Sequence, residues 1–242
     1  MKKESIEFEV GQETLRGNLY LAKNPKKPAV LFLHGWTGLP QDTGASVLAK
    51  NGYNTMTFSL SGHNNSSGKL EDQTIQKSLQ EVIAGYDFFK NKLGSGTKIG
   101  AAGNSYGGYM SILLSEERPV CCMSLRVAAN YIDDDFTVKR MGRGSENPDV
   151  FKWRHLNLKA DATRALRALH SFGGPIQIIE AGLDEMVPHE STQNYVDAAS
   201  DKTKLDYHLM EDWPHSLGLD AERNRTYQKI LLDWLNKISE QI

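Results

Sequence analysis

Short apolar stretches alternate along this chain with longer stretches in which apolar residues recur every three or four positions. Residues 5–10 and 14–22 alternate apolar with polar positions, which predicts two antiparallel strands joined at Gly11-Gln12. Residues 29–34 are almost continuously apolar, as expected of a strand covered on both faces. Apolar spacings of three and four over 72–92 predict one buried face of a long helix.

The same criteria extend this alternation to the end of the chain. Further strands are expected at 53–60, 98–103, 120–129, 175–182 and 204–210, and further helices at about 42–50, from 106 to 115, and at 161–170, 189–199 and 221–238. Such alternation predicts an α/β domain whose central sheet is mainly parallel, with helices on both faces. We expect one domain over residues 1–242, with a small cap or lid insertion in the irregular stretch at about 131–160.

The overall composition argues against several classes of partner. The 28 basic and 30 acidic residues give a net charge of −2, without the basic excess of a nucleic-acid-binding protein. No apolar run approaches the ~18 residues of a membrane span. The first ten residues lack the apolar core of a secretory signal, and adjacent Cys121 and Cys122 would form a strained bridge, so we expect reduced thiols and a cytoplasmic protein. A monomer and a homodimer both remain open.

One short motif carries candidate chemistry. Gly103-Asn104-Ser105-Tyr106-Gly107 fits the pattern G-x-S-x-G, and it lies where a predicted strand turns into a predicted helix. A sharp strand-to-helix turn exposes the serine hydroxyl and requires small neighbours, because larger side chains would collide. Ser105 is therefore the candidate nucleophile. The alternative is a glycine-rich turn without catalytic function.

A serine nucleophile needs a neutral histidine to accept its proton and an acid to orient that histidine. His215 is the candidate base, because it lies in the loop after the last predicted strand. Histidines within strands, at helix ends or in the irregular stretch are weaker candidates; these are His155, His170, His189 and His208.

The acid is expected just after the preceding strand. Asp184 follows the glycine that ends this strand, whereas Glu180 lies within it and Glu185 is expected to be solvated. The acidic run 133–135 follows an earlier strand and is the alternative source of the acid. The chain order Ser105, Asp184, His215 is the one that this strand-turn-helix architecture requires.

Transition-state stabilisation requires donors for the developing oxyanion. The backbone N–H groups of Trp36 and Tyr106 are the candidates, because they follow the third strand and the serine respectively. His34 is expected to organise the loop rather than to react. The Trp36 side chain is expected either to line an acyl pocket or to pack in the core.

Nucleotide and metal sites find no support. The segment 62–69 has five residues between its glycines and lacks the Ser or Thr of a phosphate-binding loop, and 94–100 precedes a strand instead of following one. No H-E-x-x-H pattern occurs, and the histidines are scattered.

These segments together resemble the α/β-hydrolase family over nearly the whole chain. "HGWTG" (34–38), "GNSYGG" (103–108), "GLDEMVP" (182–188) and "WPHSLG" (213–218) occur in the family's order. The loop 61–74 is similar to the "GHG-x-S-x-G" loop of small bacterial carboxylesterases of the cinnamoyl/feruloyl esterase type, with Asn64 in place of the second glycine and Trp36 in place of a phenylalanine. The elbow "GNSYGGYM" is closer to prolyl-oligopeptidase-type peptidases, which usually carry a propeller domain for which these residues leave no room.

The resemblance implies a serine carboxylesterase that hydrolyses esters with small or medium acyl groups, aromatic ones included, through an acyl-enzyme and needs no cofactor. A small peptidase or amidase, a thioesterase and a non-catalytic scaffold are the alternatives. The cap insertion would place Phe136 and Trp153 against the acyl group, unless it packs a small core of its own.

Overall fold

The structure is a computed structural model that describes residues 1–36, 38–139, 148–218, 220–240 and 242. Within these ranges eight strands form one sheet in the order β1-β2-β4-β3-β5-β6-β7-β8. Strands β1 (Lys2–Val10) and β2 (Glu13–Leu21) form the expected antiparallel hairpin, and β2 is antiparallel to β4 (Tyr53–Phe58). From β4 onward all neighbours are parallel; the remaining strands are β3 (Lys26–Leu33), β5 (Ile99–Asn104), β6 (Val120–Arg126), β7 (Ile176–Leu183) and β8 (Leu205–Pro214).

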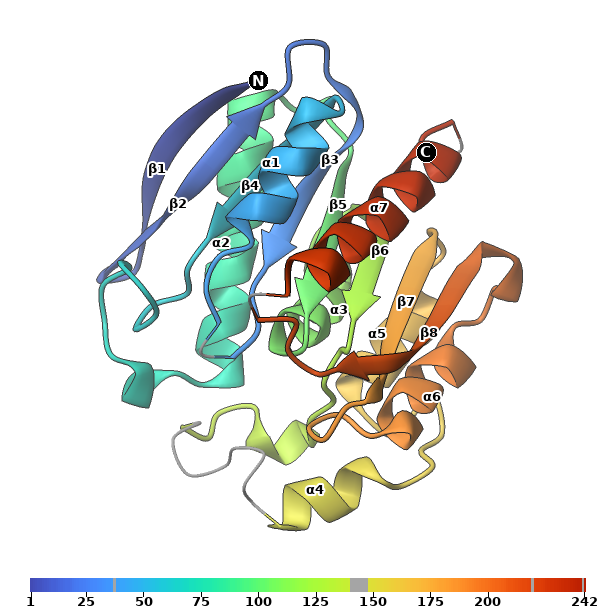
Figure 1. Cartoon of the computed structure of the whole chain (residues 1–242). Helices are drawn as coiled ribbons and strands as arrows, with labels where there is room; N and C mark the ends of the chain where they lie inside the picture. The colour runs from blue at the N-terminus through green and yellow to red at the C-terminus, as the bar shows by residue number, and fades with distance from the viewer. Residues whose placement is uncertain (37, 140–147, 219, 241) are drawn as a thin grey trace.

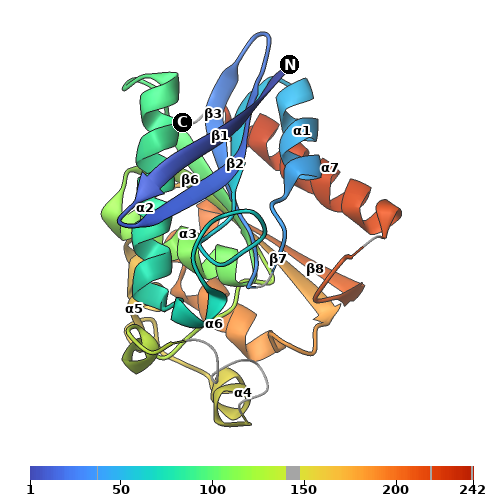
Figure 2. The same ribbon diagram turned by 90° about the vertical axis from the view of Figure 1, so that its left-hand side faces the viewer.

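Helices cover both faces of this sheet. Figure 2 shows α1 (Asp42–Lys50) and α7 (Ala221–Ile238) on one side, with α2 (Ile75–Leu93) on the other. The second face is completed by α3 (Tyr106–Glu117), α5 (Arg164–Ser171) and α6 (His189–Ala198). No described helix is both long and apolar enough to cross a membrane. The predicted fold class is therefore confirmed in its sheet and its two helical layers.

The continuous apolar sequence of β3 reflects burial on both faces. Leu31 and Leu33 pack into the core beneath α2 and α3, whereas Val30 and Phe32 pack into the core beneath α1 and α7. Successive strand residues point to opposite faces, so a strand between two helical layers must be apolar at every position. The central strands are thereby fixed in register, and their carboxyl ends meet at one edge.

A segment between β6 and α5 lies at that edge. It contains a 3-10 turn (Asp133–Asp135) and the short helix α4 (Pro148–Arg154), which Figure 1 shows beyond the carboxyl ends of the parallel strands. The sequence predicted no helix here, because seven residues are too few for an apolar period to stand out.

Strand β6 ends earlier than the sequence predicted. It stops at Arg126, and Val127 takes a left-handed backbone conformation with φ of 44°. A β-branched residue is strained in this region. After this turn the Ala129 N–H donates to the carbonyl oxygen of Ser105 at 3.1 Å. The residues that leave the sheet therefore hold the backbone of the serine turn in place.

The cysteines agree with the expectation of free thiols, but only one of the two is fully buried. Cys121 and Cys122 are both free thiols, the former half-buried and the latter buried.

Candidate active site

Ser105 occupies a strained turn between β5 and α3. Its φ of 53° and ψ of −115° lie outside the regions that non-glycine residues normally adopt, a conformation that costs about 1–3 kcal/mol. Three backbone hydrogen bonds hold it there: Ser105 N–H donates to the Arg126 carbonyl at 2.9 Å, and the Ser105 carbonyl accepts from Tyr109 and Ala129. Such strain persists only where the surrounding structure enforces it, which is typical of functional sites.

The glycines around Ser105 are required by close backbone contacts. A Cβ at Gly103 would lie 2.2 Å from the Gly107 carbonyl oxygen, and one at Gly107 would lie 2.1 Å from the Leu33 carbonyl oxygen. Added to Gly108, a Cβ would approach that of Ala128 to 2.7 Å. The steric argument made from the sequence for Gly103 and Gly107 is therefore correct.

His215 and Asp184 are brought together by the pairing of two parallel strands. Leu183 of β7 and Pro214 of β8 are register partners, and the chain continues from them into Asp184 and His215. His215 Nδ1 lies 2.7 Å from Asp184 Oδ2 and 2.9 Å from Oδ1. Two residues separated by 31 positions thus meet because their strands end side by side.

The environment of Asp184 keeps it an acceptor. Its side chain is only 3% exposed, and Oδ1 accepts the backbone N–H groups of Met186 and Val187, each at 2.8 Å. An ionised carboxylate beside Nδ1 favours the tautomer in which Nδ1 carries the proton. The other ring nitrogen of His215, Nε2, is then an acceptor.

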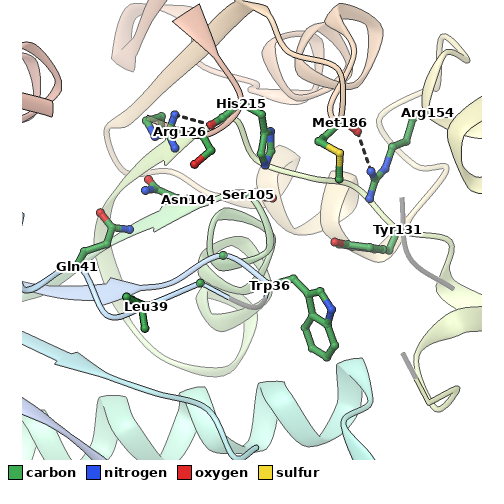
Figure 3. Close-up of a pocket in the computed structure, with 13 residues that line it drawn as sticks. Trp36, Leu39, Gln41, Asn104, Ser105, Arg126, Tyr131, Arg154, Met186 and His215 are labelled. Carbon is green, nitrogen blue, oxygen red and sulfur yellow. Dashed lines mark hydrogen bonds between the residues drawn. The ribbon is translucent and has the colours of Figure 1, made fainter. Parts of the chain in front are cut away.

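Ser105 and His215 line a single cavity of about 500 Å³. In Figure 3 the His215 ring points toward Ser105. The Ser105 hydroxyl makes no hydrogen bond to any residue that the structure describes, this ring included. Nucleophile and base contacts are often long in ligand-free hydrolases and shorten when substrate binds.

The segment after β3 forms the opposite wall of the cavity. Gly35 and Trp36 line it, and Trp36 packs edge-on against Tyr106 with ring centroids 5.4 Å apart. Tyr106 is the first residue of α3, and the N–H groups of a first helical turn point out of the helix end. Both sequence candidates for oxyanion donors therefore belong to segments that border the serine.

His34 supports this wall from inside the protein. It is 4% exposed; its Nε2 accepts the Leu60 N–H at 3.1 Å, and its Nδ1 lies 2.8 Å from the Gly35 carbonyl oxygen. Burial lowers the pKa of His34 from its ordinary 6.5 to about 4. A neutral histidine that bridges two loops has an organising role, as the sequence suggested.

The loop 61–74 packs behind Trp36. His63 lies between His34 and Trp36, with ring centroids 5.0 and 5.1 Å away. Asn64 has φ of 49°, a left-handed conformation that asparagine tolerates better than other non-glycine residues. This explains how asparagine can replace the second glycine of the loop.

The segment 131–160, which the sequence predicts to be a cap, brings other described residues to the cavity than Phe136 and Trp153. Phe136 packs on the core with the Arg164 guanidinium 5.0 Å from its ring centre, and neither Phe136 nor Trp153 lines the cavity. Tyr131 and Arg154 do line it. Tyr131 packs edge-on against Tyr106 and Tyr109, so this segment contacts the helix that follows the serine.

Sequence reasoning also missed Arg126, which lines the same cavity. It is the one charged residue of the buried strand "VCCMSLR", and a charge at the end of such a strand was the available signal. It was overlooked because the predicted strand continued to 129.

The rival acids and histidines have other partners. Asp133 accepts the Arg164 N–H at 2.8 Å and pairs with Arg167, at the start of α5. Glu180 is buried and bonds His189 at 2.8 Å, while Glu185 is exposed. Hydrogen-bond partners of the remaining three histidines are Glu190 for His155, Ala198 for His170 and Asp206 for His208. Among the described residues, no three His, Cys, Asp or Glu side chains are grouped so that they could hold a metal ion.

Comparison with known proteins places the chain in a family. The model of the prolyl oligopeptidase family matches residues 41–241. The chain belongs to the prolyl oligopeptidase family, and it is a serine hydrolase.

Solved structures show the same fold. Est1E of Butyrivibrio proteoclasticus, determined with ferulic acid bound, has 22% identity and a TM-score of 0.74 over 96% of this chain and 99% of its own. The esterase Pf2001 of Pyrococcus furiosus has 20% identity and a TM-score of 0.73 over 98% of this chain and 92% of its own. The acylaminoacyl peptidase of Pyrococcus horikoshii has 16% identity and a TM-score of 0.72 over 97% of this chain but 41% of its own. The α/β-hydrolase fold predicted from the sequence is confirmed.

Proposed function

We propose that this serine hydrolase is a carboxylesterase that acts through an acyl-enzyme. The observation that carries the proposal is the Asp184–His215 hydrogen bond of 2.7 Å, whose imidazole shares one cavity with the strained Ser105. The two esterases of like fold, one with ferulic acid bound, support an ester rather than another acyl substrate.

In the first half-reaction Ser105 Oγ attacks the ester carbonyl carbon while its proton passes to His215 Nε2. Asp184 stabilises the imidazolium that forms and keeps the ring in place. The N–H groups of Trp36 and Tyr106 donate to the oxyanion of the tetrahedral intermediate. The intermediate then releases the alcohol, which takes the proton from His215.

In the second half-reaction water attacks the acyl-enzyme. His215 removes a proton from that water. The second tetrahedral intermediate then breaks its bond to Ser105 Oγ, which takes this proton back from His215, and the acid is released. Every bond change is supplied by the triad and water. A cavity of about 500 Å³ suits a small or medium ester, and short-chain nitrophenyl esters should react faster than long-chain ones.

A peptidase or amidase is the second candidate, favoured by the family and by the elbow sequence at 103–110. Amide hydrolysis needs efficient protonation of an amine leaving group. Rates on aryl esters, matched thioesters and aminoacyl anilides of one acyl group separate these activities. Faster turnover of the anilide than of the ester would favour the peptidase.

A fluorophosphonate probe tests the catalytic assignment itself. The wild type should be labelled and should hydrolyse 4-nitrophenyl butyrate, and Ser105→Ala should do neither. Ser111→Ala, at a buried serine six positions later in α3, is the matched control and should still be labelled. Absence of labelling in the wild type, or labelling that survives Ser105→Ala, would contradict the proposal.

A further inference from the structure

Arg126 is a buried cation in the wall of the candidate active site. It ends β6, its residue is 5% exposed, and it lines the cavity that holds Ser105 and His215. Nη1 donates to the His215 carbonyl oxygen at 3.0 Å, as Figure 3 shows. Nε is buried and has no acceptor, and Nη2 makes no hydrogen bond to a described residue. One edge of the guanidinium is thus left without a protein partner in the part of the chain that the structure describes.

The Arg126 guanidinium forms no ion pair with a carboxylate among the described residues. The carboxylate that attracts its charge is Asp184, but the oxygens of Asp184 already accept hydrogen bonds from His215, Met186 and Val187. Tyr227 of α7 covers the guanidinium with its ring centre 5.7 Å away, which supplies no hydrogen-bond acceptor. Burial lowers the pKa of Arg126, yet a guanidinium remains protonated at neutral pH. Leaving a buried charge partly unpaired is costly unless a ligand pairs with it.

The surroundings of the cavity add positive charge. Its described lining residues include Arg126 and Arg154 and no Asp or Glu. Arg154 is 4% exposed, but its Nη1 donates to the Met186 carbonyl oxygen at 2.8 Å. Its guanidinium lies over the Tyr131 ring, 5.2 Å from the ring centre. A second cavity of about 470 Å³ adjoins the first and shares Arg126 as a wall. The acid on that side, Asp42, accepts hydrogen bonds from Asn18 and Thr57.

We propose that Arg126 binds a carboxylate of the substrate, so that the enzyme selects esters that carry a second, ionised carboxyl group. A carboxylate in the cavity would accept a hydrogen bond from Nη2. A second, parallel hydrogen bond from Nε requires the guanidinium to turn, because Nε is closed to solvent in this structure. Bound there, the carboxylate would be fixed beside the strand end that supports Ser105, which would orient the ester carbonyl toward the nucleophile. The inference rests on the proposed esterase function and specifies its substrate class.

The competing explanation is that Arg126 only positions the loop of His215 through the Nη1 hydrogen bond. A positioning role would affect every ester equally, because all of them need His215. A carboxylate receptor would affect anionic esters far more than neutral ones. The two roles are therefore distinguished by the ratio of kcat/KM for an anionic ester to that for its neutral counterpart, and not by either value alone.

Two pairs of isosteric substrates supply that ratio. Monoethyl succinate and ethyl succinamate place a carboxylate or a neutral amide on the acyl side. The second pair, 3-carboxyphenyl butyrate and 3-carbamoylphenyl butyrate, places them on the alcohol side. The wild type should prefer the carboxylate member of at least one pair by about 10-fold or more in kcat/KM, given the strength of hydrogen bonds to charged groups.

Arg126→Met should reduce that preference by roughly 10- to 100-fold, while the rate on the amide falls much less. Arg225→Met removes the same charge from an exposed position on α7 and should retain the preference. Arg126→Lys, which keeps the charge without the planar fork, should retain part of it.

Several results would overturn the proposal. The proposal is wrong if the wild type hydrolyses the amide member of each pair as fast as the carboxylate member. This result needs no variant, so it holds even if Arg126→Met fails to fold. Equal losses on both members in Arg126→Met would leave only a positioning role. Loss of the preference in Arg154→Met but not in Arg126→Met would move the receptor to Arg154. Failure of the esterase function is recognised separately, because no ester of either pair would then react, whether or not the fluorophosphonate labels Ser105.

Discussion

His215 Nδ1 lies 2.7 Å from Asp184 Oδ2 because the strand ends that carry these residues are paired at Leu183 and Pro214. The contact therefore depends on the register of β7 and β8, and it is anchored by the two backbone N–H groups that hold Asp184 Oδ1. A side chain so fixed can orient a histidine without adjusting its own conformation.

Replacing Asp184 with asparagine should reduce kcat by orders of magnitude, up to about 10⁴-fold, because the amide stabilises the wrong imidazole tautomer. Steady-state kinetics on 4-nitrophenyl butyrate measures the effect. Asp133→Asn is the control for the alternative acid, and it should leave kcat within a few-fold because Asp133 contacts Arg164 and Arg167 instead. A mild effect of Asp184→Asn with a severe effect of Asp133→Asn would reverse the assignment.

Gly107→Ala should destabilise the protein by more than about 2 kcal/mol, because the new Cβ would lie 2.1 Å from the backbone oxygen of Leu33. Gly96→Ala is the matched control. No atom lies within 4 Å of a Cβ built there, so its free energy of unfolding should change by about 0.5 kcal/mol or less. Urea denaturation of both variants measures the difference, and equal stabilities would contradict the packing described for the serine turn.

Asn64→Val should cost about 1–2 kcal/mol, because a β-branched residue is strained at φ of 49°. Asn65→Val, at the next exposed position, removes the partner of the same side-chain hydrogen bond but has no left-handed backbone. Its stability should therefore stay close to that of the wild type. Asn64→Gly should match or exceed the wild type in the same denaturation experiment, since glycine adopts this conformation freely.

The buried His34 should make the free energy of unfolding decrease as the pH falls below the ordinary pKa of histidine. Its pKa in the folded protein is about 4, below the ordinary value of 6.5, because burial disfavours the charged ring. As pH falls between these values the unfolded chain binds a proton that the native state does not. Folding stability is then lost, by up to about 3 kcal/mol when the pH reaches the folded value.

The His34 contribution is measured as a difference between two proteins. His34→Gln can still accept the Leu60 N–H but cannot titrate. Denaturation from about pH 7 down to about pH 4 should show the stability of the wild type falling relative to that of the variant. A constant difference across this range would mean that the histidine is not kept neutral by burial.

Much of the architecture followed from local patterns. The antiparallel hairpin, the apolar β3 and the helix α7, whose bounds were predicted as 221–238, are specified by periodicity and turn residues. The candidate nucleophile also followed, since the glycines around Ser105 mark a backbone approach that tolerates no side chain. Errors occurred at strand ends, as at β6, where Val127 leaves the sheet through a strained conformation.

The sequence by itself determined the α/β class and the strand-to-helix turn at Ser105; it predicted His215 as base and Asp184 as acid, with the run 133–135 as the alternative acid. Tertiary structure alone decided the strand order, the residues of the cap that face the cavity, and the burial of Arg126 between Tyr227 and His215. The physical reason is the separation along the chain over which each effect acts. Periodicity and steric limits act between neighbours in the chain, whereas burial and charge pairing depend on contacts between residues far apart in it, such as Arg126 and Tyr227.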